Sequence, residues 1–165
     1  MDCKIILESL DIPNEYNIIL GQAHFIKTVE DIYESIVCSV PQAEFGLAFS
    51  EASGPCLIRK DGTNHELEEI AVRNIAKIAA GHSFLIVLKN LFPLNILPAI
   101  KDCREVVHIF CATANPVQVI LAESNQGRGI LGVIDGFSPQ GTEGEKEIKE
   151  RKSFLRSIGY KKGVE

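Results

Sequence analysis

Apolar residues recur along the whole chain in two spacings, one typical of strands and the other of helices. Short apolar runs bounded by turn residues predict strands, and the run at residues 82–88 is the most apolar of them. A run without polar interruption is expected for a central strand that is covered on both faces. The predicted strands span residues 3–10, 17–20, 45–49, 56–60, 82–88, 106–111, 117–122 and 129–134.

Between these runs, apolar residues three and four positions apart predict helices. Thr28, Thr63 and Thr142 are placed to cap three of them, because a threonine hydroxyl can accept a hydrogen bond from the first turn. Gly81 follows the clearest helical pattern, at a position where glycine commonly ends a helix. The last helix is highly charged in its first half and is expected to face solvent. The predicted helices span residues 28–40, 63–80, 96–102 and 142–158.

The order of these elements predicts one compact α/β domain over residues 1–165. Helices separate many of the earlier strands, whereas three strands follow one another with short links near the end. Short links join antiparallel strands, since a parallel neighbour needs a longer crossover. We therefore expect a mixed β-sheet with an antiparallel C-terminal portion, packed by helices.

Composition narrows the class of protein. The chain has 165 residues, a net charge of −5 and mostly scattered basic residues, so nucleic acid is not an expected partner. No apolar run is long enough to span a bilayer and the N-terminus lacks the pattern of a signal peptide, so no membrane association is expected. The five cysteines are widely spaced without a CxxC pair, which favours buried free thiols in the cytoplasm over a structural zinc site.

A glycine-rich stretch at residues 127–143 surrounds the short apolar run 130–134. Arg128 and Asp135 lie at the two ends of that run. Arginine is suited to binding phosphate, and aspartate to holding a metal ion or accepting a proton. The same pattern also fits a hairpin strand with glycine turns, since Asp135–Gly136 is a common turn pair. Either interpretation places Arg128 and Asp135 at strand ends.

Further polar residues adjoin other predicted strands, where α/β proteins commonly bind ligands. His24 and His82 each follow a break that contains glycine, and a neutral imidazole is a competent base or a nucleophile toward phosphorus. From the residues alone, a structural role is the simpler interpretation of both. His65 is expected to be solvated, and His108 to be a hydrogen-bonded core residue. The other candidate binding residues are Lys27, Ser50, Glu51, Ser53 and Asn115.

The common nucleotide-binding motifs are missing from the sequence. There is no GxxxxGK[ST] loop, and the protein-kinase motifs are absent. The Gly127–Gly129 pair lacks the third glycine and the following helix of dinucleotide-binding folds. A nucleotide site in this chain therefore needs a different construction.

Six separated segments resemble the adenosine-specific kinase family, a small archaeal and bacterial group of single-domain proteins. They read GQAHFIKTVEDIYE, FGLAFSEASG, AGHSFLIVL, ATANPVQVILAE, GRGILGVIDGFSPQGTE and RKSFLRSIGYKKG. The resemblance implies binding of adenosine and AMP, a stable phosphohistidine, and phosphoryl transfer involving adenosine. It also implies a homotrimer or higher homo-oligomer with sites near the subunit interfaces.

The resemblance leaves the phosphorylated histidine between two positions. The family's phosphohistidine matches His82 in AGHSF, and His24 in GQAHF is the second candidate. A phosphorylated imidazole splits one transfer into two, with ATP as the expected phosphate donor. The expected function is an adenosine-specific kinase that works through a phosphohistidine, in which Asp135 is a further catalytic candidate. The alternative is a module that senses AMP or adenosine without catalysis.

Phosphoryl transfer depends on positioning and charge neutralisation, so the remaining candidates are assigned by residue type. Basic side chains hold phosphate oxygens, and carboxylates bind Mg²⁺ delivered with ATP or accept the ribose hydroxyl proton. Small polar side chains bind adenine or ribose. No residue is assigned to a resident metal ion, and no organic cofactor is expected. The three groups are Lys27 with Arg128, Glu51 with Asp135, and Ser50 and Ser53 with Asn115.

Overall fold

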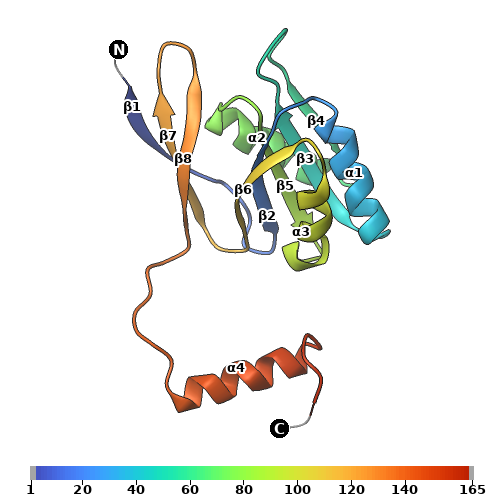
Figure 1. Cartoon of the computed structure of the whole chain (residues 1–165), viewed down its shortest axis with the longest axis vertical. Helices are drawn as coiled ribbons and strands as arrows, with labels where there is room; N and C mark the ends of the chain where they lie inside the picture. The colour runs from blue at the N-terminus through green and yellow to red at the C-terminus, as the bar shows by residue number, and fades with distance from the viewer. Residues whose placement is uncertain (1–2, 164–165) are drawn as a thin grey trace.

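A computed structural model describes residues 3–163 and arranges their strands in two antiparallel sheets (Figure 1). The larger sheet has the order β4-β3-β5-β2-β6, and the smaller one has the order β1-β7-β8. The strands are β1 (Lys4–Ser9), β2 (Asn17–Ala23), β3 (Glu44–Ser50), β4 (Ile58–Gly62), β5 (Ser83–Lys89), β6 (Val106–Thr113), β7 (Val117–Glu123) and β8 (Arg128–Asp135).

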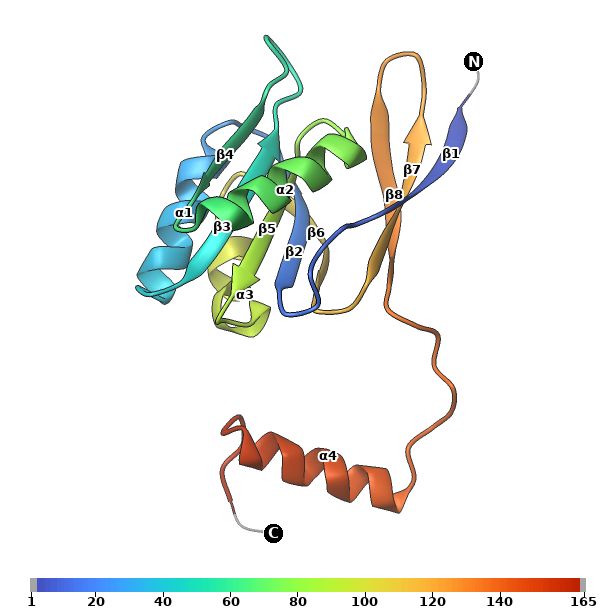
Figure 2. The ribbon, with the colours of Figure 1, turned by 180° about the vertical axis from the view of Figure 1, so that it is seen from behind.

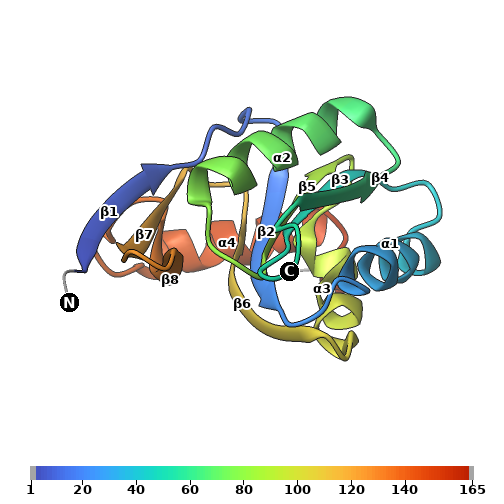
Figure 3. The same ribbon diagram turned by 90° about the horizontal axis from the view of Figure 1, so that it is seen from above.

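Three helices cover the two faces of the larger sheet (Figure 3). Leu85 and Val87 of β5 pack into a core with α2 and the smaller sheet, whereas Phe84 and Ile86 pack into a core with α1 and α3. Strand β5 is therefore covered on both faces, as its uninterrupted apolar run predicts. The helices are α1 (Thr28–Ser39), α2 (His65–Ile78) and α3 (Pro93–Asp102).

The predicted α/β domain and its antiparallel C-terminal portion are confirmed. The strands divide between two sheets instead of sharing one mixed sheet, because β7 turns away from β6 and pairs with the N-terminal strand β1. Among the described residues, every strand ladder is antiparallel, and the parallel pairing is an isolated bridge between Ala80 and Arg128. The spacing of apolar residues sets which face of a strand is buried, and it leaves the partner strand open.

Two predictions about the ends of α2 are wrong by one or two residues. The side chain of Asn64 caps the helix, whereas the Thr63 hydroxyl accepts a hydrogen bond from the N–H of Phe45 and ties the helix start to β3. The left-handed residue that ends α2 is Ala79, so Gly81 lies beyond the helix. Both Thr63 and Asn64 are suitable N-cap residues, so the sequence does not decide between them, and the contact of Thr63 with β3 does.

Close packing fixes α2 against β3. A Cβ atom on Gly46 would lie 2.1 Å from the backbone of Leu67 and Glu68, in the first turn of α2. Side chains do not approach backbone so closely, so this position requires glycine. The contact sets the height of α2 above the sheet and thereby places the far end of the helix.

Thr28 and Thr142 also do not act as caps. The Thr28 hydroxyl donates to a backbone carbonyl of the preceding turn, and α4 (Glu145–Ser157) begins after Gly144. None of the α4 residues is buried, and Figures 1 and 2 show this helix lying apart from both sheets. The expectation that it faces solvent is confirmed. Within residues 3–163, no helix has the length and apolar character needed to cross a membrane.

Candidate functional site

Several strand ends meet at one end of the molecule. Strands β3 and β2 flank β5 and run antiparallel to it, so both of them end beside the start of β5. The bridge between Ala80 and Arg128 adds the start of β8 from the smaller sheet. This arrangement brings to the same end of the fold His24, Ser50, Glu51, His82 and Arg128.

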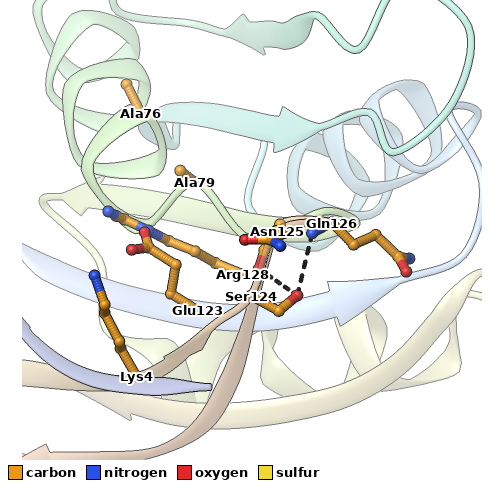
Figure 4. Close-up of a pocket in the computed structure, with 9 residues that line it drawn as sticks. Lys4, Ala76, Ala79, Glu123, Ser124, Asn125, Gln126 and Arg128 are labelled. Atoms are coloured by element: carbon orange, nitrogen blue, oxygen red, sulfur yellow. Dashed lines mark hydrogen bonds and ion pairs between the residues drawn. The ribbon is translucent and has the colours of Figure 1, made fainter. Parts of the chain in front are cut away.

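An open cavity of about 840 Å³ lies at this end, between the loop after β3, the C-terminal end of α2 and the β7–β8 turn. Its volume suits a small organic ligand. Ser50, Glu51 and Arg128 are the predicted site residues that line it. An adjoining hollow of about 660 Å³ is lined by Lys4, Glu123 and Arg128 together with that turn (Figure 4).

His82 lies beside the cavity in a firmly held backbone conformation. Its φ is 62°, in the left-handed region that residues with a side chain rarely adopt. The His82 N–H donates to the Ser50 carbonyl at 2.7 Å, and the His82 carbonyl accepts from the Ala23 N–H at 2.9 Å. The imidazole stacks on Phe49 with 5.8 Å between ring centroids and 17° between planes. Ser50, its hydrogen-bond partner, and Gly81, its neighbour in the chain, line the cavity, so the His82 backbone adjoins it. The half-buried imidazole does not line the cavity, because it stacks on Phe49, which belongs to the core with α1 and α3.

Arg128 connects the smaller sheet with α2. Its Nε donates to Glu123 Oε2 at 2.6 Å, and its Nη1 donates to the Lys77 carbonyl at 3.0 Å. The second contact places a cation at the C-terminal end of α2, where the helix dipole favours positive charge. Neither contact uses Nη2, so that nitrogen stays available to donate to an anionic ligand.

Glu51 is tied to the start of β4. Its Oε2 accepts from the N–H of Leu57 at 3.2 Å and from Arg59 Nη2 at 3.0 Å. Both contacts use the same oxygen, which leaves Oε1 open to a proton or a ligand. The loop that follows Glu51 packs closely on the turn leading into β5, because a Cβ atom on Gly81 would lie 2.8 Å from the Cβ of Ala52.

His24 and Lys27 lie at the same end of the larger sheet but serve a different surface. His24 is exposed and stacks on Phe25, with 6.2 Å between ring centroids. The Lys27 ammonium pairs with the Asp31 carboxylate and lies 3.1 Å from Oε1 of the buried Glu105. Hydrogen bonds to these carboxylates raise the pKa of Lys27, and the bond from Lys27 lowers the pKa of Asp31. Lys27 therefore stabilises an acidic pair at a separate hollow beside α1 and α3 and does not line the main cavity.

Asp135, Asn115 and Ser53 are not brought to the cavity. Asp135 ends β8 at the opposite end from Arg128, about 23 Å away at the rise of an extended strand. Its Oδ1 accepts from Thr113 Oγ1 at 2.8 Å and from Asn115 Nδ2 at 3.1 Å, which stabilises the link between β6 and β7. Ser53 lies in the exposed loop after β3. All three residues follow strands in the sequence, but the topology puts Asp135 and Asn115 at the end of the fold opposite the cavity, and Ser53 lies at the cavity end without lining it.

The other two histidines lie away from the cavity. His65 begins α2 with 80% of its side chain exposed, as expected. The expectation of a core position for His108 is wrong, because it is exposed on β6, an edge strand of the larger sheet. Its ring meets Phe110 edge-on, with 4.7 Å between centroids. The apolar neighbours of His108 in sequence concealed the open side of the strand.

Several residues at the cavity escaped the sequence analysis. Lys4 belongs to the N-terminal strand, which lies outside the six segments that carry the resemblance. Ser124 and Gln126 belong to the β7–β8 turn just before the glycine-rich stretch. Cys56 lines the cavity as an exposed free thiol. A polar turn between two predicted strands is the one sequence signal that pointed to any of them.

The acidic residues at the cavity are few. Within residues 3–163, no group of three or more histidine, cysteine, aspartate or glutamate side chains is arranged to hold a metal ion. A Mg²⁺ ion delivered with ATP needs only one or two protein carboxylates, since phosphates and water supply its other ligands. Glu51 and Glu123 line the cavity and the adjoining hollow and fit that smaller requirement.

Similarity to known proteins extends over nearly the whole chain. The family described as Adenosine specific kinase matches residues 9–161. The crystal structure of the PH1918 protein from Pyrococcus horikoshii OT3 is similar to this chain at 39% sequence identity, with a TM-score of 0.94. The match covers 98% of this chain and 100% of that chain. No curated protein matches the sequence. By the extent of the family match, the chain belongs to the adenosine-specific kinase family.

Proposed function

We propose that this chain phosphorylates adenosine to AMP with ATP as the donor and with His82 as a phosphorylated intermediate. Membership of the adenosine-specific kinase family supports adenosine as the substrate. The observation that carries the choice of His82 is its left-handed backbone, held by hydrogen bonds to β2 and to Ser50 of β3, of which Ser50 lines the cavity. Unfavourable backbone conformations persist where the surrounding structure imposes them, and they are concentrated at functional sites.

The proposed reaction has two transfers. An imidazole nitrogen of His82 attacks the γ-phosphorus of ATP, the bond from that phosphorus to the bridging oxygen breaks, and ADP leaves. The 5′-hydroxyl of adenosine then attacks the phosphorus, the N–P bond breaks, and AMP forms. We assign Oε1 of Glu51 to accept the hydroxyl proton, because Oε2 is already engaged by Arg59. Stacking on Phe49 holds the imidazole in one orientation during both steps.

Charge neutralisation falls to the basic residues at the cavity. Arg128 presents Nη2 while its other nitrogens are fixed, so the guanidinium is oriented before a phosphate arrives. Lys4 adds a second positive charge in the adjoining hollow. Ser50 and Gln126 supply polar groups of the size needed to bind ribose or adenine. We assign Glu123 to the Mg²⁺ of bound ATP, so that Oε1 of Glu51 stays free to accept the hydroxyl proton.

The second candidate for phosphorylation is His24. Its neighbour Ala23 donates a backbone hydrogen bond to His82, so the two histidines belong to adjoining segments. The His24 N–H donates to the Glu105 carbonyl at 3.0 Å, but its side chain is exposed and stacks on the exposed Phe25, whereas His82 stacks on the buried Phe49. We therefore rank His82 first. Lys27, Ser53, Asn115 and Asp135 keep no role in the proposed chemistry.

We also propose that the active form is a homotrimer or higher homo-oligomer, as the family resemblance implies, and that it works in the cytoplasm, as the unpaired cysteines favour. Large exposed apolar side chains support an assembly, because a monomer would leave them in water. Leu131 and Ile5 on the smaller sheet and Phe137 just after it are the most exposed of these near the C-terminal segment.

Turnover with magnesium, ATP and adenosine tests the proposal. Wild-type protein is expected to form AMP and ADP in equal amounts and to carry phosphate on His82, located by mass spectrometry at neutral or alkaline pH. A His82→Gly variant is expected to lose both, whereas a His65→Gly variant, changed at an exposed distant histidine, keeps both.

Two results would contradict the proposal in different ways. Phosphate on His24 in the His82→Gly variant, with AMP still formed, would move the intermediate to the second histidine. Binding of AMP or adenosine without any turnover would support the alternative, a sensor that binds the nucleoside or nucleotide without catalysis. The sensor alternative is supported by the contacts of Glu51 with Arg59 and of Arg128 with Glu123, because residues held in this way can bind a ligand without taking part in catalysis.

A further inference from the structure

Helix α4 has an apolar stripe that no other residue between 3 and 163 buries. At 100° per residue, Ile148, Phe154, Leu155 and Ile158 fall within about a third of the helix circumference. Phe154 keeps 60% of its surface exposed and Ile158 keeps 44%. An isolated helix of thirteen residues is marginal in water, so α4 needs a surface that covers this stripe.

The position of α4 away from the body is built into the chain. Residues 136–163, here called the C-terminal arm, leave β8 at Gly136, whose φ of 67° turns the chain. The Arg151 guanidinium makes two hydrogen bonds to the Glu143 carboxylate, at 3.0 and 2.7 Å, which ties the residues just before α4 to its second turn. In this conformation the arm lies apart from both sheets (Figures 1 and 2).

A solved relative holds its C-terminal arm in the same position. The arm makes up about a sixth of the chain, and a displaced segment of that length is incompatible with a TM-score of 0.94 over 98% of the residues. The extended arm is thus shared with a crystal structure at 39% identity. A conserved shape with an uncovered stripe indicates that the covering surface comes from another molecule.

Charge identifies the kind of partner. Residues 151–163 carry five lysines and arginines and no acidic residue, which gives that segment a charge of +5. Residues 1–135 carry ten lysines and arginines against seventeen aspartates and glutamates, a net charge of −7. The basic end of the arm therefore complements the acidic body of a second copy of this chain.

The smaller sheet offers an apolar face of matching size. Its inner face is buried through Val119 and Leu121, while on the outer side Ile5 is 66% exposed, Leu7 52% and Leu131 61%. A thirteen-residue helix is about 20 Å long. Strands of six to eight residues have about the same length. The arm also leaves the body from this sheet, at the end of β8, so neighbouring copies can exchange arms over adjacent faces.

We infer that α4 of one copy docks its apolar stripe on the outer face of the smaller sheet of a second copy, so that subunits assemble by exchanging C-terminal arms. This inference rests on the homo-oligomer of the proposed function and is independent of the adenosine chemistry. In a ring, each copy gives one arm and receives one, which leaves no stripe uncovered.

Substitutions on the two faces of α4 test the exchange. Phe154→Asp with Ile158→Asp puts two charges into the stripe, whereas Ser153→Asp with Ser157→Asp puts the same two charges on the opposite face. The first pair is expected to weaken association on the order of a hundredfold or more, seen by sedimentation and light scattering, because two buried apolar groups become charged. The second pair is expected to leave the oligomer intact. Leu7→Asp, on the receiving face, is expected to dissociate it as well.

Each contrary outcome overturns a stated part of the inference. An oligomer that survives Phe154→Asp with Ile158→Asp excludes the helix, and one that survives Leu7→Asp alone excludes this receiving face. A monomeric wild type that floats with phosphatidylserine vesicles through the stripe would make α4 a membrane-surface helix, since basic amphipathic helices also bind lipid. Circular dichroism and adenosine calorimetry on each variant separate dissociation from unfolding. Adenosine turnover by a monomer would remove the exchange and keep the kinase proposal.

Discussion

Replacing His82 by glycine, with alanine at the same position for comparison, tests whether its backbone is strained. At a φ of 62°, a residue with a Cβ atom is about 1–2 kcal/mol less favourable than glycine. Both substitutions remove the imidazole and its stacking on Phe49, worth about 0.5–1.5 kcal/mol. The stacking loss is common to both variants, so their difference isolates the backbone. The glycine variant is expected to be the more stable of the two by about 1 kcal/mol.

Urea unfolding measures this difference, and Arg73 provides a control of opposite sign. Arg73 is an exposed residue inside α2, where alanine is expected to be more stable than glycine by about 1 kcal/mol. Both His82 variants are also expected to lose phosphate incorporation, although the glycine variant stays close to wild type in stability. An alanine variant at position 82 that is more stable than the glycine variant, as at Arg73, would refute the left-handed conformation and the argument built on it.

Three further predictions concern the fold and its charges. Gly46→Ala is expected to destabilise the protein by about 3 kcal/mol in urea, because its Cβ would lie 2.1 Å from backbone, whereas Gly141→Ala, in open space, changes stability by less than about 0.5 kcal/mol; equal effects would contradict the packing of α2. Burial raises the pKa of the Cys111 thiol to about 11, so iodoacetamide at pH 8 is expected to spare Cys111 until the protein unfolds, and rapid labelling of the native state would speak against its burial. Lys27→Met is expected to lower stability more at pH 7 than at pH 3. The hydrogen bond from Lys27 holds the pKa of Asp31 below its usual 3.8, so the stabilisation from this pair is fully present above pH 3.8 and is lost as the pH falls through the lower pKa of the folded protein. An equal loss of stability at both pH values would exclude this pairing.

The elements of the fold could be predicted from local patterns. The continuous apolar run at residues 82–88 indicated the doubly covered strand β5, and the strand and helix positions followed from spacing. The pairing of β7 with β1 could not be predicted in this way, because periodicity sets the buried face and not the partner. The predicted caps failed for different reasons: a tertiary contact with β3 engages the Thr63 hydroxyl, the Thr28 hydroxyl donates to the local carbonyl of Phe25, and α4 begins beyond Thr142.

The candidate site was predicted in part. Sequence placed polar residues at strand ends, but only the sheet order decides which ends coincide, so Arg128 joined Ser50 and Glu51 while Asp135 went to the opposite end. The left-handed backbone of His82 has no sequence signal, since histidine adopts that conformation only where the surrounding structure requires it. Lys4 comes from a strand whose position next to the cavity depends on the unpredicted second sheet.

We propose that adenosine occupies the cavity next to the His82 backbone, and protection of a native cysteine tests this. Cys56 and Cys38 are both exposed free thiols, but only Cys56 lines the cavity, so Cys38 is an internal control. With saturating adenosine, confirmed by calorimetry, iodoacetamide is expected to modify Cys56 on the order of tenfold more slowly while the rate at Cys38 stays constant. Heat of binding with unchanged labelling of Cys56 would place adenosine elsewhere and contradict the account.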